Sequence, residues 1–225
     1  MTKPTLDKLC EGFNQIYPAA ITEILEEFGY RRQWLGPDIV PLHPEMKVSG
    51  PAFTMRAVND PVVRDKGDEK ERKKFASMVE KLQPNMVPII EASACDDSGW
   101  WGELMCNLCM QKGIKGTVID GGVRDALYIY KLGFNMFYKF SCPHEANSRA
   151  RIINHQEPIF IHGVAINPGD FIVAELGGVI VVPQDIVYDV YDKVQELLAK
   201  ESETRRMILE GVPFEEILRE QHGQI

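Results

Sequence analysis

Residues 117–125 read Thr117-Val118-Ile119-Asp120-Gly121-Gly122-Val123-Arg124-Asp125, and they are the most informative segment of the 225-residue chain for its fold. An apolar run leads into two glycines, and a charged pair follows where a helical pattern of apolar residues begins. The pattern predicts a strand over residues 116–120, a Gly-Gly turn and a helix over residues 124–132. In α/β sheets, junctions at the carboxyl ends of strands are where ligands gather.

The segments on either side of this stretch alternate in the same way. Short apolar runs over residues 86–91 and 135–140 have the length of buried strands. Helical spacing of apolar residues covers residues 101–112, between two of the predicted strands. The order strand, helix, strand, helix, strand predicts an α/β core in which neighbouring strands are parallel.

Periodicity and turn residues also predict the flanking segments. Helices are expected over residues 18–29, 65–82, 186–198 and 213–221, a loop over 31–46, and strands over 48–58, 158–164, 170–174 and 179–183. Tight turns between the last three strands predict a second, partly antiparallel sheet. Because the linkers are short, we predict one domain over residues 1–225, with a helical tail from about residue 184.

Composition argues against several classes of function. The chain is 44% hydrophobic and has a formal net charge of −8, whereas nucleic-acid binders usually carry a basic face. No apolar run reaches the roughly 18 residues that a membrane helix needs. The first residues contain no apolar signal-peptide core. We therefore expect a cytoplasmic protein that binds neither nucleic acid nor membranes.

The cysteines and histidines do not form a recognisable reactive motif. Cys106 and Cys109 make a C-x-x-C, but a structural zinc site needs four ligands and the sequence contains no second pair. The two cysteines share one face of the predicted helix, which favours two buried thiols over a redox or zinc motif. No histidine pair has the spacing of a metal-binding motif.

The first candidate for chemistry is the charged pair at the predicted helix start. Arg124 has a planar fork that can bind a carboxylate through two hydrogen bonds, and the first helical turn offers N–H groups to an anion. Asp125 supplies hard oxygen ligands, which suit Mg²⁺ or Mn²⁺. The alternative interpretation is an acid that stabilises the helix dipole, with the arginine as its surface partner.

A second loop-to-helix junction, residues 96–105, favours the chemical interpretation. Gly102 permits close backbone approach, and Glu103 places a carboxylate near the start of the predicted helix. Two such junctions side by side in one sheet would form a shared pocket with Arg124 and Asp125. The adjacent tryptophans, Trp100 and Trp101, are interpreted as packing residues rather than substrate contacts.

Several motifs occur together and in order: Gly102-Glu103-Leu104, Asp120-Gly121-Gly122-Val123-Arg124-Asp125, Pro168-Gly169-Asp170 and Gly178-Val179-Ile180-Val181-Val182-Pro183. With this set the chain resembles the class II 4-hydroxy-4-methyl-2-oxoglutarate aldolase / ribonuclease E inhibitor-like (RraA-like) family over residues 18–211. The resemblance implies a swivelling β/β/α fold and a homotrimer or homohexamer. It also implies aldol cleavage of small 2-oxo acids that releases pyruvate, usually with oxaloacetate decarboxylation.

The resemblance assigns roles to individual residues. Asp125 would bind the divalent metal, Mg²⁺ or Mn²⁺, and Arg124 would hold the carboxylate or oxo group of the substrate. Glu103 would order a metal-bound water. Glu23 corresponds to an acid near the site, and Glu203 to one that reaches the site of a neighbouring subunit. The backbone amides that would contact the substrate are those of Gly102, Glu103, Leu104 and Met105.

One departure from the family's pattern concerns the distal half of the substrate. Where the family tends to have paired acids before the last strand, this chain has Glu175-Leu176-Gly177-Gly178-Val179, with a single acid. Two other functions therefore stay open beside the lyase. One is a non-catalytic regulator that binds a ribonuclease, and the other is a divergent hydrolase, dehydratase or decarboxylase on the same scaffold.

Overall fold

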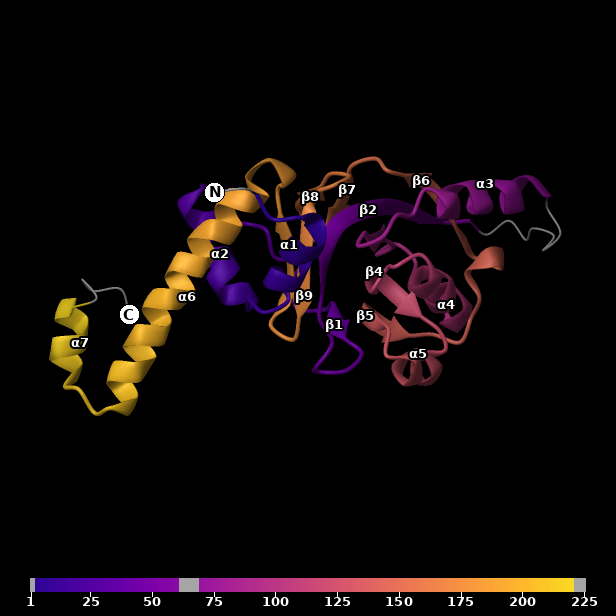
Figure 1. Ribbon diagram of the computed structural model, residues 1–225. Helices are drawn as coiled ribbons and strands as arrows, with labels where there is room; N and C mark the ends of the chain where they lie inside the picture. Colours follow the sequence, from indigo (N-terminus) through magenta and orange to yellow (C-terminus); the bar gives the residue numbers. More distant parts are fainter. Residues whose placement is uncertain (1–2, 61–68, 221–225) are drawn as a thin grey trace.

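The computed structural model describes residues 3–60 and 69–220, and its central feature is an eight-stranded sheet (Figure 1). The strands follow the order β1-β5-β4-β3-β2-β9-β10, with β6 paired to β2. Their bounds are β1 Val40–Pro41, β2 Val48–Asn59, β3 Val87–Glu91, β4 Gly116–Val123, β5 Asn135–Ser141, β6 Ala150–His155, β9 Phe171–Glu175 and β10 Gly178–Val182.

The middle of this sheet is parallel, which confirms the predicted α/β core. β2 pairs with β3, β3 with β4 and β4 with β5, all in parallel. The helices α4, Glu103–Gln111, and α5, Ala126–Leu132, connect these strands. Side chains such as Val118 and Ile119 are fully buried in the main core. Crossover helices cover parallel strands, and this explains why the strands are apolar runs rather than alternating ones.

The predicted second sheet is only partly present, because one long strand joins both halves of the molecule. β2 pairs in parallel with β3 through Ala52–Arg56, and in antiparallel fashion with β9 through Val48–Pro51. β9 and β10 therefore belong to the main sheet. The separate antiparallel pair is a small hairpin, whose strands are β7 Ile159–Ile161 and β8 Val164–Ile166.

The single strand predicted over residues 158–164 is wrong for a local reason. His162 and Gly163 both adopt positive φ, 49° and 79°, and they form the tight turn between β7 and β8. Backbone of that kind cannot continue a strand. β1 and β6 were also missed: β1 lies inside the predicted loop 31–46, and β6 is an edge strand on β2.

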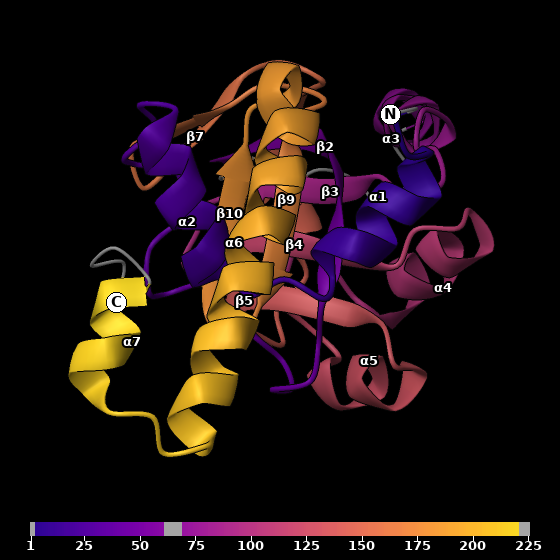
Figure 2. The ribbon, with the colours of Figure 1, turned by 60° about the vertical axis from the view of Figure 1, so that its left-hand side comes forward.

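Helices from both ends of the chain cover the β9–β10 end of the sheet. The helices are α1 Leu6–Phe13, α2 Pro18–Glu27 and, after the short 3₁₀ turn Gln184–Ile186, α6 Val187–Leu209. Figure 2 shows α6 lying across β9 and β10. Phe13, Leu25 and Val190 are buried there in a second apolar cluster. The final helix, α7 Phe214–Glu220, packs against α6.

The surface helix predicted over residues 65–82 is α3, Glu69–Glu80, and the start of that prediction lies outside the described residues. Its buried residues are Met78 and Val79, which join the main core. Within residues 3–60 and 69–220, no helix is long and apolar enough to cross a membrane.

Candidate functional site

The candidate site lies where β4 ends and α5 begins. Arg124 follows the last residue of β4, and Asp125 is the N-cap of α5. Asp125 has φ 60° and ψ 26°, the left-handed region, which aspartate tolerates better than most residues. This sharp reversal turns the chain from the strand into the helix and leaves both side chains partly exposed, at 36% and 40%.

The predicted Gly-Gly turn is wrong, because Gly121 and Gly122 are inside β4. The register between β4 and β5 shifts between Ile119 and Gly122, which is a bulge rather than a reversal. The glycines serve another purpose. A Cβ on Gly122 would stand 2.5 Å from the backbone oxygen of Ser98, so its absence lets the loop before α4 lie directly on the strand.

That loop brings the second predicted junction to the first. The N–H of Trp100 donates to the oxygen of Gly122 at 2.9 Å, and the N–H of Arg124 donates to the oxygen of Trp101 at 2.9 Å. Trp101 is 2% exposed and belongs to the main core. This agrees with its interpretation as a packing residue. The two loop-to-helix junctions are therefore adjacent in space, as the sequence predicts.

Asp125 is the residue at which these elements meet. Its Oδ2 atom lies 3.3 Å from the N–H of Glu103, which donates to it, and 3.6 Å from Nε of Arg124. A Cβ on Gly102 would stand 2.6 Å from the same oxygen and 2.9 Å from Nε of Arg124. A glycine at position 102 is thus what allows the carboxylate and the guanidinium to occupy their observed positions.

The first turn of α4 presents the backbone that the resemblance assigns to substrate. The N–H of Cys106 donates to the oxygen of Gly102, so the N–H groups of Leu104 and Met105 precede the first bond of the helix. The side chain of Leu104 is 75% exposed. The carboxylate of Glu103 accepts a hydrogen bond from Nδ2 of Asn107, one turn further along the helix.

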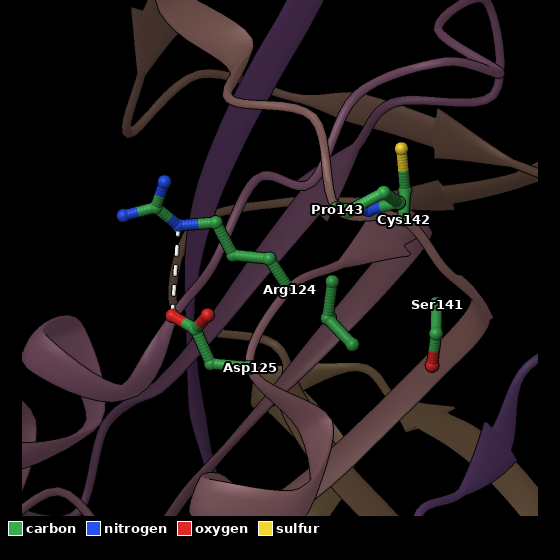
Figure 3. Close-up of a pocket in the computed structure, with 6 residues that line it drawn as sticks. Arg124, Asp125, Ser141, Cys142 and Pro143 are labelled. Atoms are coloured by element: carbon green, nitrogen blue, oxygen red, sulfur yellow. Dashed lines mark ion pairs between the residues drawn. The ribbon is translucent and has the colours of Figure 1, made fainter.

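A pocket of about 240 Å³ opens beside Arg124 and Asp125 (Figure 3). Its other wall consists of Val123, the last residue of β5 and the two residues after it. Sequence reasoning missed this wall, whose residues are Ser141, Cys142 and Pro143. Their position directly after the next parallel strand was the signal available, since the carboxyl ends of parallel strands meet at one edge.

The donor set suits a hard divalent cation. Asp125 and Glu103 offer carboxylate oxygens, and the described residues contain no group of three or more histidine, cysteine or acidic side chains arranged to hold a metal. Mg²⁺ is often bound by one or two carboxylates and completes its coordination with water and substrate oxygens. A site with few protein ligands therefore fits Mg²⁺ or Mn²⁺ better than zinc.

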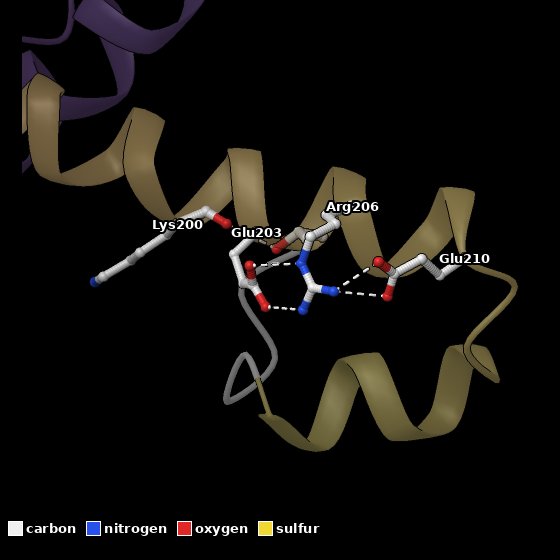
Figure 4. A network of polar contacts seen from close by, with 5 residues as sticks. Lys200, Glu203, Arg206 and Glu210 are labelled. Carbon is white, nitrogen blue, oxygen red and sulfur yellow. Dashed lines mark hydrogen bonds and ion pairs between the residues drawn. The ribbon is translucent and has the colours of Figure 1, made fainter.

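Two predicted acids are not brought to this site within the chain. Glu23 lies in α2, which packs on α6 and β10, far from α4 and α5 in Figure 1. Glu203 lies in α6, where its carboxylate accepts hydrogen bonds from Nε and Nη2 of Arg206 (Figure 4). These bonds lower the pKa of Glu203. The sequence could not reveal that both acids lie away from the pocket, because this depends on how α2 and α6 pack at the β9–β10 end of the sheet.

The cysteines are the buried thiols that the sequence predicts. All five are free and buried. Burial raises the pKa of Cys109 to about 12 and also raises the pKa of Cys106. A thiol that keeps its proton at neutral pH is a weak nucleophile, and both side chains lie in the main core with no exposed surface. The C-x-x-C motif therefore takes part in packing the main core.

Comparison with known proteins adds a family to this geometry. The RraA-like family model, described as Aldolase/RraA, matches residues 18–181. Protein DlpA of Legionella pneumophila is 29% identical over 94% of the chain, and the chain spans only 33% of DlpA. A putative 4-hydroxy-4-methyl-2-oxoglutarate aldolase of Halalkalibacterium halodurans is 30% identical over 77% of this chain and 78% of that protein.

A solved structure gives the same result for the fold. RraAS2 of Streptomyces coelicolor, described as an unusual member of the RNase ES inhibitor RraA protein family, superposes with a TM-score of 0.78. It is 27% identical, and the match covers 88% of this chain and 97% of that one. The predicted mixed α/β fold class is confirmed.

Proposed function

Because the chain belongs to the RraA-like family of aldolases and RraA proteins, we propose that it is a divalent-metal-dependent lyase acting on small 2-oxo acids. The reactions are aldol cleavage of 4-hydroxy-2-oxo acids, which releases pyruvate, and decarboxylation of oxaloacetate. One observation carries the proposal. The carboxylate of Asp125 is fixed by the N–H of Glu103 within 3.6 Å of the guanidinium of Arg124, at the edge of an open pocket.

Asp125 is the residue that would hold Mg²⁺ or Mn²⁺, and Glu103 would order a water beside it. When bound, such an ion supplies Lewis-acid stabilisation of the negative charge that develops on the substrate's oxygens. Arg124 contributes a fixed positive charge at the same place and can bind the substrate carboxylate through two hydrogen bonds. Because the guanidinium is already positioned, little reorganisation is needed when the charge develops.

Both reactions share one electronic step. In aldol cleavage the C4 hydroxyl loses its proton, the C3–C4 bond breaks, and its electron pair remains on C3 as the enolate of pyruvate. In decarboxylation the same enolate forms when CO₂ leaves. We assign to Glu103 the acceptance of the hydroxyl proton, directly or through a water. The proton then returns to C3 and gives pyruvate.

The test measures pyruvate released from oxaloacetate and from 4-hydroxy-4-methyl-2-oxoglutarate. We expect turnover with Mg²⁺ or Mn²⁺, loss of turnover with excess chelator, and recovery when metal is restored. Arg124→Ala and Asp125→Ala should each remove turnover while circular dichroism shows a retained fold. An active Asp125→Ala protein would overturn the assignment of the metal ligand.

We propose that the active form is a closed homotrimer or homohexamer. Large apolar side chains are exposed on the two helices beside the site, namely Leu104 on α4 and Leu127 and Tyr128 on α5. Contiguous exposed apolar surface is typical of an interface, and homo-oligomers mostly have closed symmetry. Light scattering coupled to gel filtration measures the mass, and a monomer would contradict this part of the proposal.

A second candidate function is a regulator that binds a protein, because the chain resembles RraAS2, whose family is described as inhibiting a ribonuclease. The same fold can serve either role. The pairing of Asp125 with Arg124 at a pocket favours the enzyme. Stable binding to a purified ribonuclease, together with absence of pyruvate release from both substrates, would favour the regulator.

A further inference from the structure

The pocket beside Arg124 has two chemically different sides. Figure 3 shows Arg124 and Asp125 on one side, and Ser141, Cys142 and Pro143 on the other. The second side, to which Val123 also belongs, has no ionisable acid or base apart from a thiol. The hydroxyl of Ser141 lies 3.5 Å from that of Tyr138. In the described chain, Arg124 is therefore the sole cation among the residues that line the pocket.

The cationic side chains near this uncharged wall already form ion pairs with acidic side chains. Nζ of Lys139 lies 2.5 Å from Oδ1 of Asp120, whose side chain is 1% exposed. Nε of Arg149 lies 3.4 Å from Oδ2 of Asp97, and its Nη1 donates to the backbone oxygen of Glu145 at 3.2 Å. Each positive charge flanking the wall along residues 139–149 thus already has an acidic partner.

The remaining basic group of this segment is also engaged. Nδ1 of His144 lies 3.2 Å from the backbone oxygen of Asp97. A carboxylate that approached the wall would therefore meet basic groups that already have partners, and it would gain less from them than from an unpaired cation.

We propose, on the basis of the proposed function, that the wall formed by Val123, Ser141, Cys142 and Pro143 selects 2-oxo acids whose distal group is uncharged. Arg124 binds the 2-oxo carboxylate, so a second carboxylate at the far end of the substrate finds no other cation among the described residues that line the pocket. Desolvating a charge without a partner is costly, whereas an alkyl group gains from contact with Pro143 and with the exposed edge of Cys142.

The reaction for such a substrate balances without a further reactant. The substrate is a 4-hydroxy-2-oxo acid with an alkyl substituent on C4. The C4 hydroxyl proton passes to the base, the C3–C4 bond breaks, and an aliphatic aldehyde leaves. The electron pair stays on C3, which then takes up a proton and becomes the methyl group of pyruvate.

The experiment compares two substrates of nearly equal shape with the Mg²⁺-loaded protein. 4-Hydroxy-5-methyl-2-oxohexanoate carries an isopropyl group where 4-hydroxy-2-oxoglutarate carries a carboxylate, and both release pyruvate. We expect kcat/KM to favour the isopropyl substrate by about tenfold or more. Equal values, or a preference for the dicarboxylate, would overturn the inference and leave the lyase standing. Absence of pyruvate from both substrates would instead overturn the proposed function.

A charge introduced into the wall provides the second arm. Ser141 is exposed at the end of β5, so a longer side chain there need not enter the core. Ser141→Arg should raise the ratio of kcat/KM for the dicarboxylate over the isopropyl substrate by about tenfold relative to Ser141→Gln, which is similar in length but uncharged. An unchanged ratio in folded Ser141→Arg protein would show that the wall does not contact the distal group.

Discussion

Gly102 lies so close to Asp125 that a Cβ atom on the glycine would stand 2.6 Å from Oδ2 of the carboxylate. The two residues belong to different loop-to-helix junctions, and the N–H of the next residue, Glu103, donates to that same oxygen. The role of Gly102 is therefore to leave space for Asp125 and Arg124. The family resemblance implies a different role for Gly102, a direct contact between its backbone and the substrate. The same backbone can make that contact and also leave space for the two side chains.

Gly102→Ala should lower kcat/KM by about 100-fold, since small displacements of a reacting group have effects of that size. Gly211→Ala is the control for an added methyl group away from the site, because a Cβ there meets no atom within 4 Å. Gly211 has a φ of 78° and Gly102 a φ of −130°, so the control carries a backbone cost that Gly102→Ala does not. Steady-state kinetics and thermal unfolding should be measured together. Wild-type activity in Gly102→Ala would show that the close approach is unimportant.

Asp125→Asn should separate metal binding from folding. Asparagine tolerates the left-handed φ of 60° as well as aspartate does, so the melting temperature should change little. The amide is a poor ligand for Mg²⁺ compared with a carboxylate, so the metal affinity and the turnover should both fall by about 100-fold or more. Calorimetric titration with Mg²⁺ measures the metal affinity. Tight binding of Mg²⁺ to Asp125→Asn would contradict the assignment of Asp125 as the metal ligand.

Arg124→Lys should also lower kcat/KM, by about 100-fold, although the charge is retained. A lysine ammonium cannot make the two parallel hydrogen bonds of a guanidinium, and loss of one donor to a developing oxyanion has an effect of this order. The measurement is kcat/KM for pyruvate release, with Arg149→Lys as the matched control, because Arg149 pairs with Asp97 and does not line the pocket. Similar losses in both variants would indicate a structural cause instead.

The buried pair of Asp120 and Lys139 should be a strong determinant of stability. The side chain of Asp120 is 1% exposed, and His162 Nε2 lies 3.9 Å from the same oxygen that contacts Lys139. Lys139→Met would leave a buried carboxylate without its main partner, at a cost of about 3–5 kcal/mol. Adding Asp120→Asn should recover part of this loss, as measured by urea unfolding. A double variant no more stable than Lys139→Met would argue against the pairing.

Stability should also depend on His155 in the weakly acidic range. Its ring stacks on Phe53, and burial, aided by Lys81, lowers its pKa from the ordinary 6.5. The folded protein therefore binds fewer protons than the unfolded chain once the pH falls below 6.5. The contribution of His155 to the free energy of unfolding is greatest above pH 6.5, and it decreases as the pH falls through the lowered pKa.

The difference between wild type and His155→Phe measures this effect. The free energy of unfolding of the two proteins should be followed by denaturant titration from pH 7.5 to pH 5. We expect wild type to lose stability relative to the phenylalanine variant as the pH falls. A difference that is independent of pH, or one that grows in the opposite direction, would contradict the lowered pKa.

The sequence predicted most of the parallel core because its information is local. Apolar runs such as residues 86–91 and the helical spacing of residues 101–112 define each element from a few neighbouring side chains. β3 and α4 lie where these patterns place them. Arg124 and Asp125 were found in the same way, because a strand that leads into a helix is recognisable from composition alone.

The predictions that were wrong concerned features that depend on contacts between distant residues or on backbone angles. The glycines at 121 and 122 resemble a turn, yet β5 pairs with them across a bulge and they stay in the strand. The turn at His162 and Gly163 was missed, because His-Gly is not one of the dipeptides, such as Asn-Gly or Asp-Gly, that usually indicate a two-residue hairpin turn. β2 extends across both halves of the sheet, and only its pairing with β9 shows that the second half is not separate.

The α/β class, the parallel direction of the core strands and the charged pair at the start of α5 were predictable from the sequence alone, because short-range patterns of residues encode each of them. Only the tertiary structure decided that Gly102 makes room for Asp125 and that the end of β5 forms the far wall of the pocket. It also decided that Glu23 and Glu203 lie in the other helical layer. Distances of this kind follow from how separate elements pack, and no single segment contains that information.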